Sequence, residues 1–272
     1  MPKKIYLADV HGFCFGVNRA IDIALEQKAP AVTLGKLIHN SHAIRELEQK
    51  GISHVDSVDK ATGTVIIRAH GAPRQVIEKA KEMKLNVVDA TCPLVKNLLK
   101  ISQQLEGEGF QVVIVGDSSH PEIEGITSYL SNPLVIRDPD QARKLGTFDR
   151  IGVVSQTTQS QKNFEEIAGE LKQHCKELRA VNTICRATEQ RQNAALELAK
   201  KVDLMVVVGD KESSNTRMLA ELCSAVVQTE QVEDASKLKP EWFSGREKIG
   251  ITAGASTPER IVQGVVAKIK EF

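Results

Sequence analysis

Short polar segments that recur directly after apolar runs constrain the fold of this chain more than any other sequence feature. The apolar runs are rich in β-branched residues and alternate with longer stretches of helical periodicity, which predicts parallel sheets with crossover helices. Gly, His, Ser, Thr and Asn crowd the positions just after the runs. Because ligands bind at the carboxyl ends of parallel strands, these positions form the candidate functional surface.

The segments after the strands fall into three families, which indicates an internal repeat: members of the first recur at intervals of roughly 80 to 93 residues, and the second has about the same spacing. The families are 35–40 with 116–122 and 209–215, then 69–73 with 155–158 and 253–258, then 89–93 with 183–186 and 9–14. The predicted fold class is α/β, with three similar lobes of mostly parallel sheets under pseudo-threefold symmetry. We expect lobe 1 over 12–93, lobe 2 over 94–184, and lobe 3 over 185–272, completed by the N-terminal strand 1–11.

The periodicity also predicts individual elements. Strands are expected near 5–10, 31–34, 64–68, 87–89, 111–115, 133–136, 150–154, 204–208, 225–228 and 248–252. Helices are expected over 44–50, 75–84, 94–107, 161–175, 189–201, 217–222 and 258–271. A strand that is followed by a polar loop and then a helix is the unit that the pattern repeats.

Three of the five cysteines occupy equivalent places in the third family of segments. Cys14, Cys92 and Cys185 each follow a predicted strand and precede a helix, so pseudo-threefold symmetry brings one thiolate per lobe toward a common centre. Cys175, in an expected helix, and Cys223 fall outside the pattern and are interpreted as packing residues. Thiolates select zinc, copper(I) or iron-sulfur clusters, and no C-x-x-C motif decides among them.

Three protein thiolates would leave one iron of a 4Fe-4S cluster without a protein ligand. An open iron can bind a substrate oxygen as a Lewis acid. The remaining loops predict an anion pocket made mostly of neutral donors, aided by helix N-termini. Its candidate residues are His39, Asn40, His70, His120, Thr157, Thr158, Ser213, Ser214, Asn215 and Ser256.

Helix capping is the alternative role for the serines of this pocket, namely Ser213 or Ser214 and Ser256 or Thr257, and the two roles can coexist. Glu122 is the preferred proton donor because it lies in the same loop family as His39, with Glu124 as the competing choice. The other histidines, His11, His42, His54 and His174, are expected to be structural or exposed.

Composition excludes several classes of function. The formal net charge is +1 and aromatic residues make up 4% of the chain, so neither an overall field nor stacking rings favour nucleic acid. The first apolar run ends at Asp9, and no stretch approaches the length of a membrane span, which favours a cytoplasmic location without membrane insertion. Neither a P-loop nor a dinucleotide fingerprint is present.

The motifs at 12–17, 89–95, 116–125, 155–158, 213–215 and 252–256 closely resemble those of the 4-hydroxy-3-methylbut-2-enyl diphosphate reductases, the LytB/IspH family. The resemblance covers about residues 5 to 268. It implies a trefoil of three lobes around one 4Fe-4S cluster held by Cys14, Cys92 and Cys185. Phe15 departs from the small residue expected in many relatives, so packing beside Cys14 is expected to differ.

The resemblance also implies an activity, the reductive dehydroxylation of (E)-4-hydroxy-3-methylbut-2-enyl diphosphate to isopentenyl and dimethylallyl diphosphate. This is the last step of the non-mevalonate isoprenoid pathway, with reduced ferredoxin or flavodoxin as electron donor. By the same matching, Glu122 and Thr157 resemble the groups near the substrate hydroxyl. The set that resembles the diphosphate-binding residues is His39, His70, His120, Ser213, Ser214, Asn215 and Ser256. A non-enzymatic three-thiolate metal sensor for a phosphorylated metabolite remains the alternative.

Overall fold

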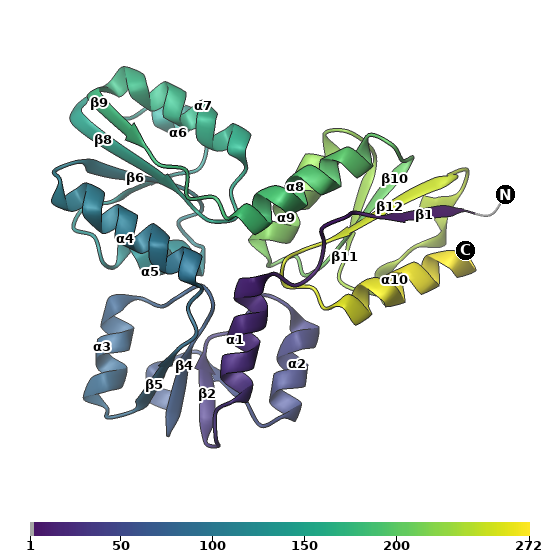
Figure 1. Ribbon diagram of the computed structural model, residues 1–272, viewed down its shortest axis with the longest axis horizontal. Coiled ribbons are helices and arrows are strands. Elements are labelled where there is room, and N and C mark those ends of the chain that lie inside the picture. The colour runs from purple at the N-terminus through teal and green to yellow at the C-terminus, as the bar shows by residue number, and fades with distance from the viewer. Residues whose placement is uncertain (1–2) are drawn as a thin grey trace. The chain divides into compact units, whose positions relative to one another are not determined.

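The computed structural model describes residues 3–272, so Met1 and Pro2 of the expected strand 1–11 lie outside the described residues. The strands are β1 (Lys4–Leu7), β2 (Ala31–Leu34), β3 (Ser53–Val55), β4 (Thr64–Ile67), β5 (Asn86–Asp89), β6 (Gln111–Val115), β7 (Leu134–Ile136), β8 (Phe148–Ser155), β9 (Cys175–Ala180), β10 (Leu204–Val208), β11 (Thr229–Val232) and β12 (Lys248–Ala253). The α-helices are α1 (Phe15–Leu25), α2 (Ser41–Gln49), α3 (Arg74–Glu82), α4 (Pro93–Gly107), α5 (Pro121–Thr127), α6 (Pro139–Arg143), α7 (Gln161–Leu171), α8 (Arg186–Ala199), α9 (Ser214–Ser224) and α10 (Glu259–Glu271). Figure 1 shows this alternation of strands and helices along the chain.

Each of the three sheets has four strands in the same order, and all the pairings are parallel. The orders are β3-β2-β4-β5, β7-β6-β8-β9 and β11-β10-β12-β1. The three families of polar segments therefore follow equivalent strands: the first follows β2, β6 and β10, the second β4, β8 and β12, and the third β5, β9 and β1. The predicted fold class of three similar α/β lobes with parallel sheets is confirmed.

The chain divides into two compact units. The first unit contains the residues up to Asn18, Ile38–Glu46 and Arg186–Phe272, and with them the sheet β11-β10-β12-β1. The second contains Arg19–Leu37 and Leu47–Cys185, with the other two sheets. The predicted lobe boundaries at 93 and 184 stay predictions.

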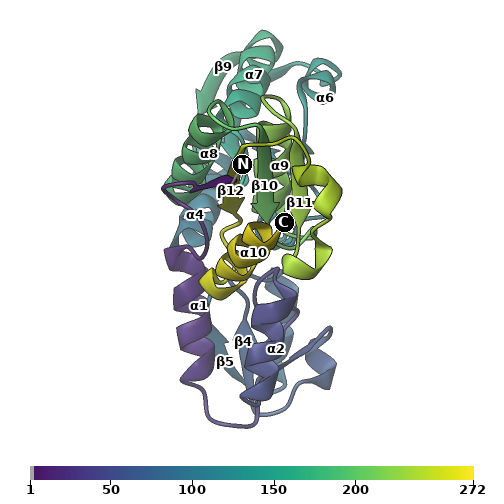
Figure 2. The ribbon, with the colours of Figure 1, turned by 90° about the vertical axis from the view of Figure 1, so that its right-hand side faces the viewer.

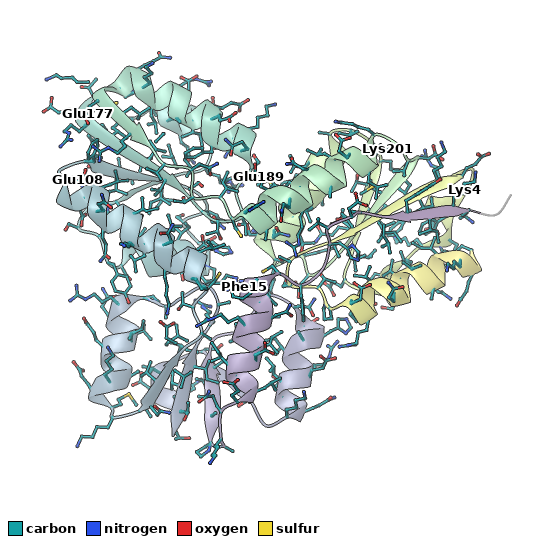
Figure 3. All side chains as sticks on the ribbon, in the orientation of Figure 1. Lys4, Phe15, Glu108, Glu177, Glu189 and Lys201 are labelled. Atoms are coloured by element: carbon teal, nitrogen blue, oxygen red, sulfur yellow. The ribbon has the colours of Figure 1, made fainter. Side chains whose placement is uncertain are left out.

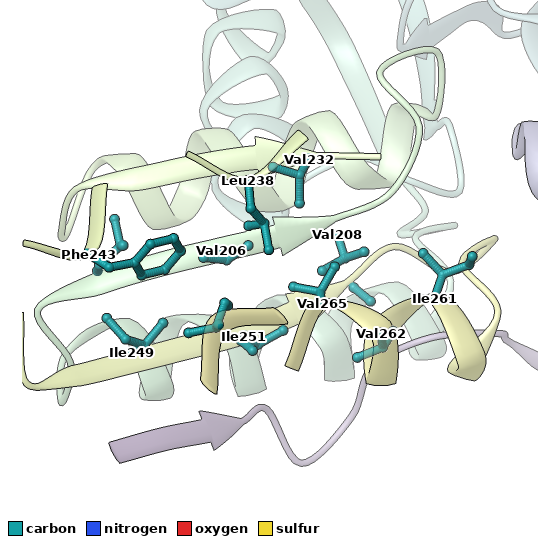
Figure 4. Close-up of a cluster of buried hydrophobic side chains, with 13 residues drawn as sticks. Val206, Val208, Val232, Leu238, Phe243, Ile249, Ile251, Ile261, Val262 and Val265 are labelled. Carbon is teal, nitrogen blue, oxygen red and sulfur yellow. The ribbon is translucent and has the colours of Figure 1, made fainter. Parts of the chain in front are cut away.

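In the first unit, all five residues of strand β10 are buried. Both faces of this strand are therefore covered. Val206 and Val208 belong to the core under α10 and the short turns η3 (Ala235–Lys237) and η4 (Pro240–Phe243). Figures 2 and 4 show α10 lying along this face. Met205 and Val207 face the other way, into a core with α8 and α9. A continuous apolar strand is what a doubly covered parallel sheet requires.

The second unit repeats this arrangement in lobe 2, where β6 alternates between two cores. Val112 and Ile114 pack with residues of α4 and α5, while Val113 and Val115 pack with residues of α7. In lobe 1, Val65 and Ile67 of β4 share a core with Ala80 of α3. These helices hold the strands so that their polar loops emerge at one end of each sheet.

Some predicted elements are wrong in position. The helix expected over 161–175 ends at Leu171, and Cys175 begins β9 instead. The strand expected at 225–228 begins at Thr229, because Ala225 caps α9 and Val226 lies exposed in a turn. Strand β9 has the sequence Cys-Lys-Glu-Leu-Arg-Ala, and none of its residues is fully buried. It lies at the edge of its sheet and lacks the apolar run from which strands are predicted.

Besides β9, four elements had no counterpart among the predictions, namely α1, β3, α5 and α6. Helix α1 buries Val17, Ala20 and Ala24 but no large apolar side chain, which gives a weak apolar stripe, and the other three elements are at most seven residues long. Across residues 3–272, no helix combines the length and apolar character needed to cross a membrane.

Candidate active site

The predicted site residues lie in both units, and each unit presents its own group. The first unit holds Cys14, His39, Asn40, Ser213, Ser214, Asn215 and Ser256, and the second holds His70, Cys92, His120, Glu122, Thr157, Thr158 and Cys185. Each group is built from loops that follow parallel strands. The two groups are described separately.

Glu122 and Thr157 make the closest polar pair of the second unit. The Thr157 backbone N–H donates to Glu122 Oε1 and the Thr157 hydroxyl donates to Oε2, both at 2.7 Å. The Glu122 side chain is buried, and burial raises the pKa of its carboxyl, against the lowering effect of the two hydrogen bonds from Thr157. A buried carboxyl with a raised pKa is suited to hold and deliver a proton. Glu124, the competing choice, is exposed.

His120 is the residue that caps the N-terminus of α5, two positions before Glu122. Its Nδ1 accepts the backbone N–H of Glu122 at 3.2 Å, so His120 caps the helix. With Nδ1 acting as acceptor, the ring proton of the neutral form lies on Nε2, which is then a donor. The His70 ring stands edge-on to the His120 ring, with centroids 5.4 Å apart. The second unit therefore brings His70, His120, Glu122 and Thr157 together.

The two cysteines of the second unit are held by backbone hydrogen bonds to these same loops. The Cys185 N–H donates to the Thr157 carbonyl oxygen at 2.9 Å, and the Cys92 N–H donates to that of Ala69 at 3.0 Å. Cys92 is the N-cap residue of α4, and α8 begins directly after Cys185. The partial positive charge of a helix N-terminus favours an anionic sulfur ligand.

In the first unit, Ser256 joins the segments that carry His39 and Ser213. Its hydroxyl donates to the His39 carbonyl oxygen at 2.8 Å and lies 3.5 Å from the Ser213 hydroxyl. The Ser213 hydroxyl accepts the Thr216 N–H, so Ser213 caps α9, and Ser214 is the first helical residue. Capping, the alternative role of these serines, is therefore confirmed for Ser213.

Asn215, in the first turn of α9, has a side chain that is 4% exposed. Neither its amide nitrogen nor its amide oxygen has a hydrogen-bond partner among residues 3–272. Burying an unpaired amide costs about 1–3 kcal/mol. A buried amide with both polar atoms available at a helix N-terminus fits a residue that binds an anionic ligand.

The Cys14 segment follows β1 and runs beside the end of β12. The Cys14 N–H donates to the Ala255 carbonyl oxygen at 3.1 Å, and α1 begins at the next residue, Phe15. Phe15, labelled in Figure 3, is 71% exposed at the start of α1, so most of it faces solvent.

None of the five cysteines forms a disulfide within residues 3–272. Cys14, Cys92 and Cys185 share one setting, a half-buried thiol at the residue before a helix. Cys223 is fully buried, and burial raises its pKa to about 12, which makes it a poor metal ligand. The Cys175 thiol donates to the Leu171 carbonyl oxygen at 3.5 Å, and burial raises its pKa as well. The thiols of Cys14, in the first unit, and of Cys92 and Cys185, in the second, therefore have the donor chemistry of metal ligands.

The remaining candidates have local structural roles. The Asn40 amide oxygen accepts the Ala43 N–H at 3.0 Å and caps α2, and the Thr158 hydroxyl accepts from the Gln156 amide. Among the other histidines, His11 contacts Glu259, His42 contacts Asp234 and His54 contacts Glu48, as expected of structural residues.

Sequence reasoning missed two residues that organise the site. Gln156 is buried, and its amide oxygen accepts the Asp117 N–H at 3.0 Å, which ties the loop after β8 to the loop after β6. Arg191 is also buried and donates to the backbone of the Cys14 segment. Its signal in the sequence is a single charged residue in the inward stripe of the helix expected over 189–201.

Three parallel α/β sheets, each followed by a cysteine that stands directly before a helix, define a class of three-lobed α/β proteins with thiols suited to bind a metal. The LytB protein family model matches residues 5–270, and the chain belongs to this family, which consists of iron-sulfur reductases. The chain is 42% identical to the 4-hydroxy-3-methylbut-2-enyl diphosphate reductase of Anaeromyxobacter sp. (strain Fw109-5), over 98% of this chain and 97% of that one. It is 43% identical to the enzyme of the same name from Pelobacter propionicus, over 99% and 98%.

Two solved structures of reductases are similar to this chain over nearly its whole length. The structure of an (E)-4-hydroxy-3-methyl-but-2-enyl diphosphate reductase, described as the terminal enzyme of the non-mevalonate pathway, is similar with a TM-score of 0.70 and 38% identity over 100% of both chains. The E-1-hydroxy-2-methyl-but-2-enyl-4-diphosphate reductase from Plasmodium falciparum is similar with a TM-score of 0.92 and 29% identity, over 98% of this chain and 88% of that one. The family predicted from the motifs is confirmed.

Proposed function

We propose that this protein catalyses the reductive dehydroxylation of (E)-4-hydroxy-3-methylbut-2-enyl diphosphate to isopentenyl and dimethylallyl diphosphate, the last step of the non-mevalonate pathway. Full-length relatives named as this reductase support the assignment. The reaction consumes two electrons and two protons, breaks the carbon–oxygen bond of the hydroxyl, forms a carbon–hydrogen bond and releases water. The observation that carries the mechanism is the buried Glu122 carboxyl paired with Thr157.

The proposed cofactor is one 4Fe-4S cluster held by Cys14, Cys92 and Cys185. Their half-buried thiols, each placed before a helix, support this choice, and the setting of Cys175 and Cys223 does not. When bound, the cluster would supply electrons and one iron open to the substrate hydroxyl. Cys14, Cys92 and Cys185 follow β1, β5 and β9, so each of the three sheets contributes one of the proposed ligands.

The diphosphate would be anchored by side chains and helix N-termini of the polar loops. Asn215 offers a buried amide, and the Ser213 and Ser256 hydroxyls lie 3.5 Å apart beside the start of α9. His70 and His120 add ring N–H donors, and Ser214 and His39 complete the proposed set. Anchoring a remote charged group converts binding energy into orientation at the reacting carbon.

Proton delivery falls to Glu122 and Thr157 in this proposal. Because burial keeps the Glu122 carboxyl protonated to higher pH, it enters the reaction as an acid. When Oε2 carries the proton, it donates to the Thr157 hydroxyl, whose own proton then turns toward the substrate hydroxyl. Protonation makes that hydroxyl a better leaving group, because it departs as water.

Reduced ferredoxin or flavodoxin is the proposed electron donor, in the cytoplasm, without nucleic-acid partners or membrane insertion. The test is anaerobic turnover of the allylic diphosphate with a reduced dye, with iron and sulfide analysis of the same sample. Turnover with about four irons per chain is expected for one cluster. Iron-free protein that remains fully active would refute the proposal, and an intact metal site without turnover would favour a sensor.

A further inference from the structure

Arg191 is a buried arginine on α8 that contacts the backbone of the Cys14 segment within the first unit. Its side chain is 4% exposed. Nε and Nη2 both donate to the Gly12 carbonyl oxygen, at 3.1 and 2.8 Å, and Nη1 donates to the Ala187 carbonyl oxygen at 2.7 Å. One guanidinium therefore joins the Cys14 segment to the first turn of α8, which begins directly after Cys185.

The Gly12 carbonyl that Arg191 binds lies two residues before Cys14, in a segment with little freedom. Gly12 has a φ of 71°, in the left-handed region, and its N–H bonds the Ala253 carbonyl oxygen. A Cβ at this position would lie 3.3 Å from the Thr257 carbonyl oxygen. Arg191 thus fixes the direction of the peptide that leads into Cys14.

Arg191 also places a permanent positive charge in the protein interior. A guanidinium stays protonated at any pH that the folded protein survives, and burying it costs free energy that its interactions in the fold must offset. A cationic lysine could not donate two bonds to one carbonyl with the same planar geometry. Arg191 thus combines a buried charge with a planar guanidinium that bonds the backbone just before Cys14, a predicted metal ligand. This combination indicates a role beyond packing.

We propose that Arg191 is a positioning residue for the iron-sulfur centre, which orients the Cys14 segment and favours the reduced state of the cluster by its charge. This inference rests on the proposed function, because it requires the cluster. Reduction adds negative charge to the centre, and a fixed cation that bonds the backbone two residues before Cys14 would stabilise the product of that step. Arg191 does not touch the substrate or transfer protons.

The experiment compares holoprotein prepared anaerobically from wild type, Arg191→Gln, Arg191→Lys and Arg246→Gln. Gln keeps a donor for the Gly12 carbonyl but removes the charge, and Lys keeps the charge but loses the planar fork. Arg246 is the matched control, since it is in the same unit and donates to the Asp203 carbonyl oxygen, just before β10. Iron per chain, the rate of iron loss in air and the reduction potential are measured for each.

Arg191→Gln is expected to lower the equilibrium constant for one-electron reduction about tenfold, a potential more negative by about 59 mV. Arg191→Lys keeps a potential close to wild type but loses iron faster, and Arg246→Gln matches wild type in both. A wild-type potential in Arg191→Gln, or an equal shift in Arg246→Gln, overturns the electrostatic role. If Arg191→Gln cannot retain the cluster, wild-type iron loss in Arg191→Lys overturns the positioning role. A wild-type protein without iron would instead refute the proposed function.

Discussion

The Cys185 backbone N–H donates to the carbonyl oxygen of Thr157 at 2.9 Å. Thr157 in turn gives both its N–H and its hydroxyl proton to the Glu122 carboxyl. One threonine therefore connects a predicted metal ligand to the predicted acid, across segments that follow different strands of lobe 2. A displacement of the Cys185 segment would also displace the hydrogen-bond partner of the acid.

Glu122→Gln is expected to lower turnover about 10²- to 10⁴-fold, because an amide cannot supply the proton that a general acid provides. The amide is nearly isosteric and can still accept the Thr157 N–H, so iron content and substrate affinity should stay close to wild type. Steady-state kinetics and iron analysis check both points. The matched control is Glu124→Gln, two residues along and exposed, which should retain turnover. Wild-type turnover in Glu122→Gln would remove this carboxyl from the mechanism.

The same substitution predicts a pH effect on stability. Burial raises the pKa of Glu122 above its ordinary value of 4.5, so the folded protein binds this proton more tightly than the unfolded chain does. Its contribution to stability is complete below pH 4.5 and is lost as the pH rises toward the folded pKa.

Relative to wild type, Glu122→Gln should therefore gain free energy of unfolding as the pH rises through this window, by up to about 1.4 kcal/mol per pH unit. Denaturant titrations of both proteins at a series of pH values measure this difference. Curves that remain parallel across the whole range would show that the carboxyl titrates normally.

The cysteines should separate into two classes on replacement by serine. Cys14→Ser, Cys92→Ser and Cys185→Ser should each reduce iron per chain and turnover, because a hydroxyl is a poor substitute for a thiolate ligand. Cys175→Ser should leave iron unchanged. Cys223→Ser should also keep its iron, but lose about 1–3 kcal/mol of stability, because it buries a hydroxyl in an apolar core. Equal iron loss in all five variants would contradict the assignment of ligands.

Asn215 and Asn40 are both buried asparagines of the first unit, yet their replacement should have different effects on stability. Asn215→Leu removes an amide that has no partner in the described chain, so stability should be unchanged or rise by about 1 kcal/mol while KM rises about 10- to 100-fold. Asn40→Ala removes the cap of α2 and should cost about 0.5–2 kcal/mol of stability. Thermal unfolding and substrate titration measure both. A strongly destabilised Asn215→Leu would indicate a structural amide.

The sequence predicted the features that depend on local pattern. Strands β6 and β10 coincide with the expected ranges 111–115 and 204–208, because a buried parallel strand is a continuous apolar run. Helix α1 and strand β9 were missed because an alanine-lined helix and a polar edge strand carry little apolar signal. The prediction of a helix through Cys175 was also wrong, because the polar strand β9 begins at this residue.

What the sequence by itself determined is the repeat of strand, polar loop and helix, and with it the equivalent places of Cys14, Cys92 and Cys185. Those features follow from periodicity, which is written in neighbouring residues. Only the tertiary structure decided that Thr157 bonds Glu122, that Asn215 is buried without a partner, and that Arg191 reaches the Gly12 carbonyl from 179 positions away. Desolvation and hydrogen bonds between distant segments depend on how the chain packs, and no local pattern encodes them.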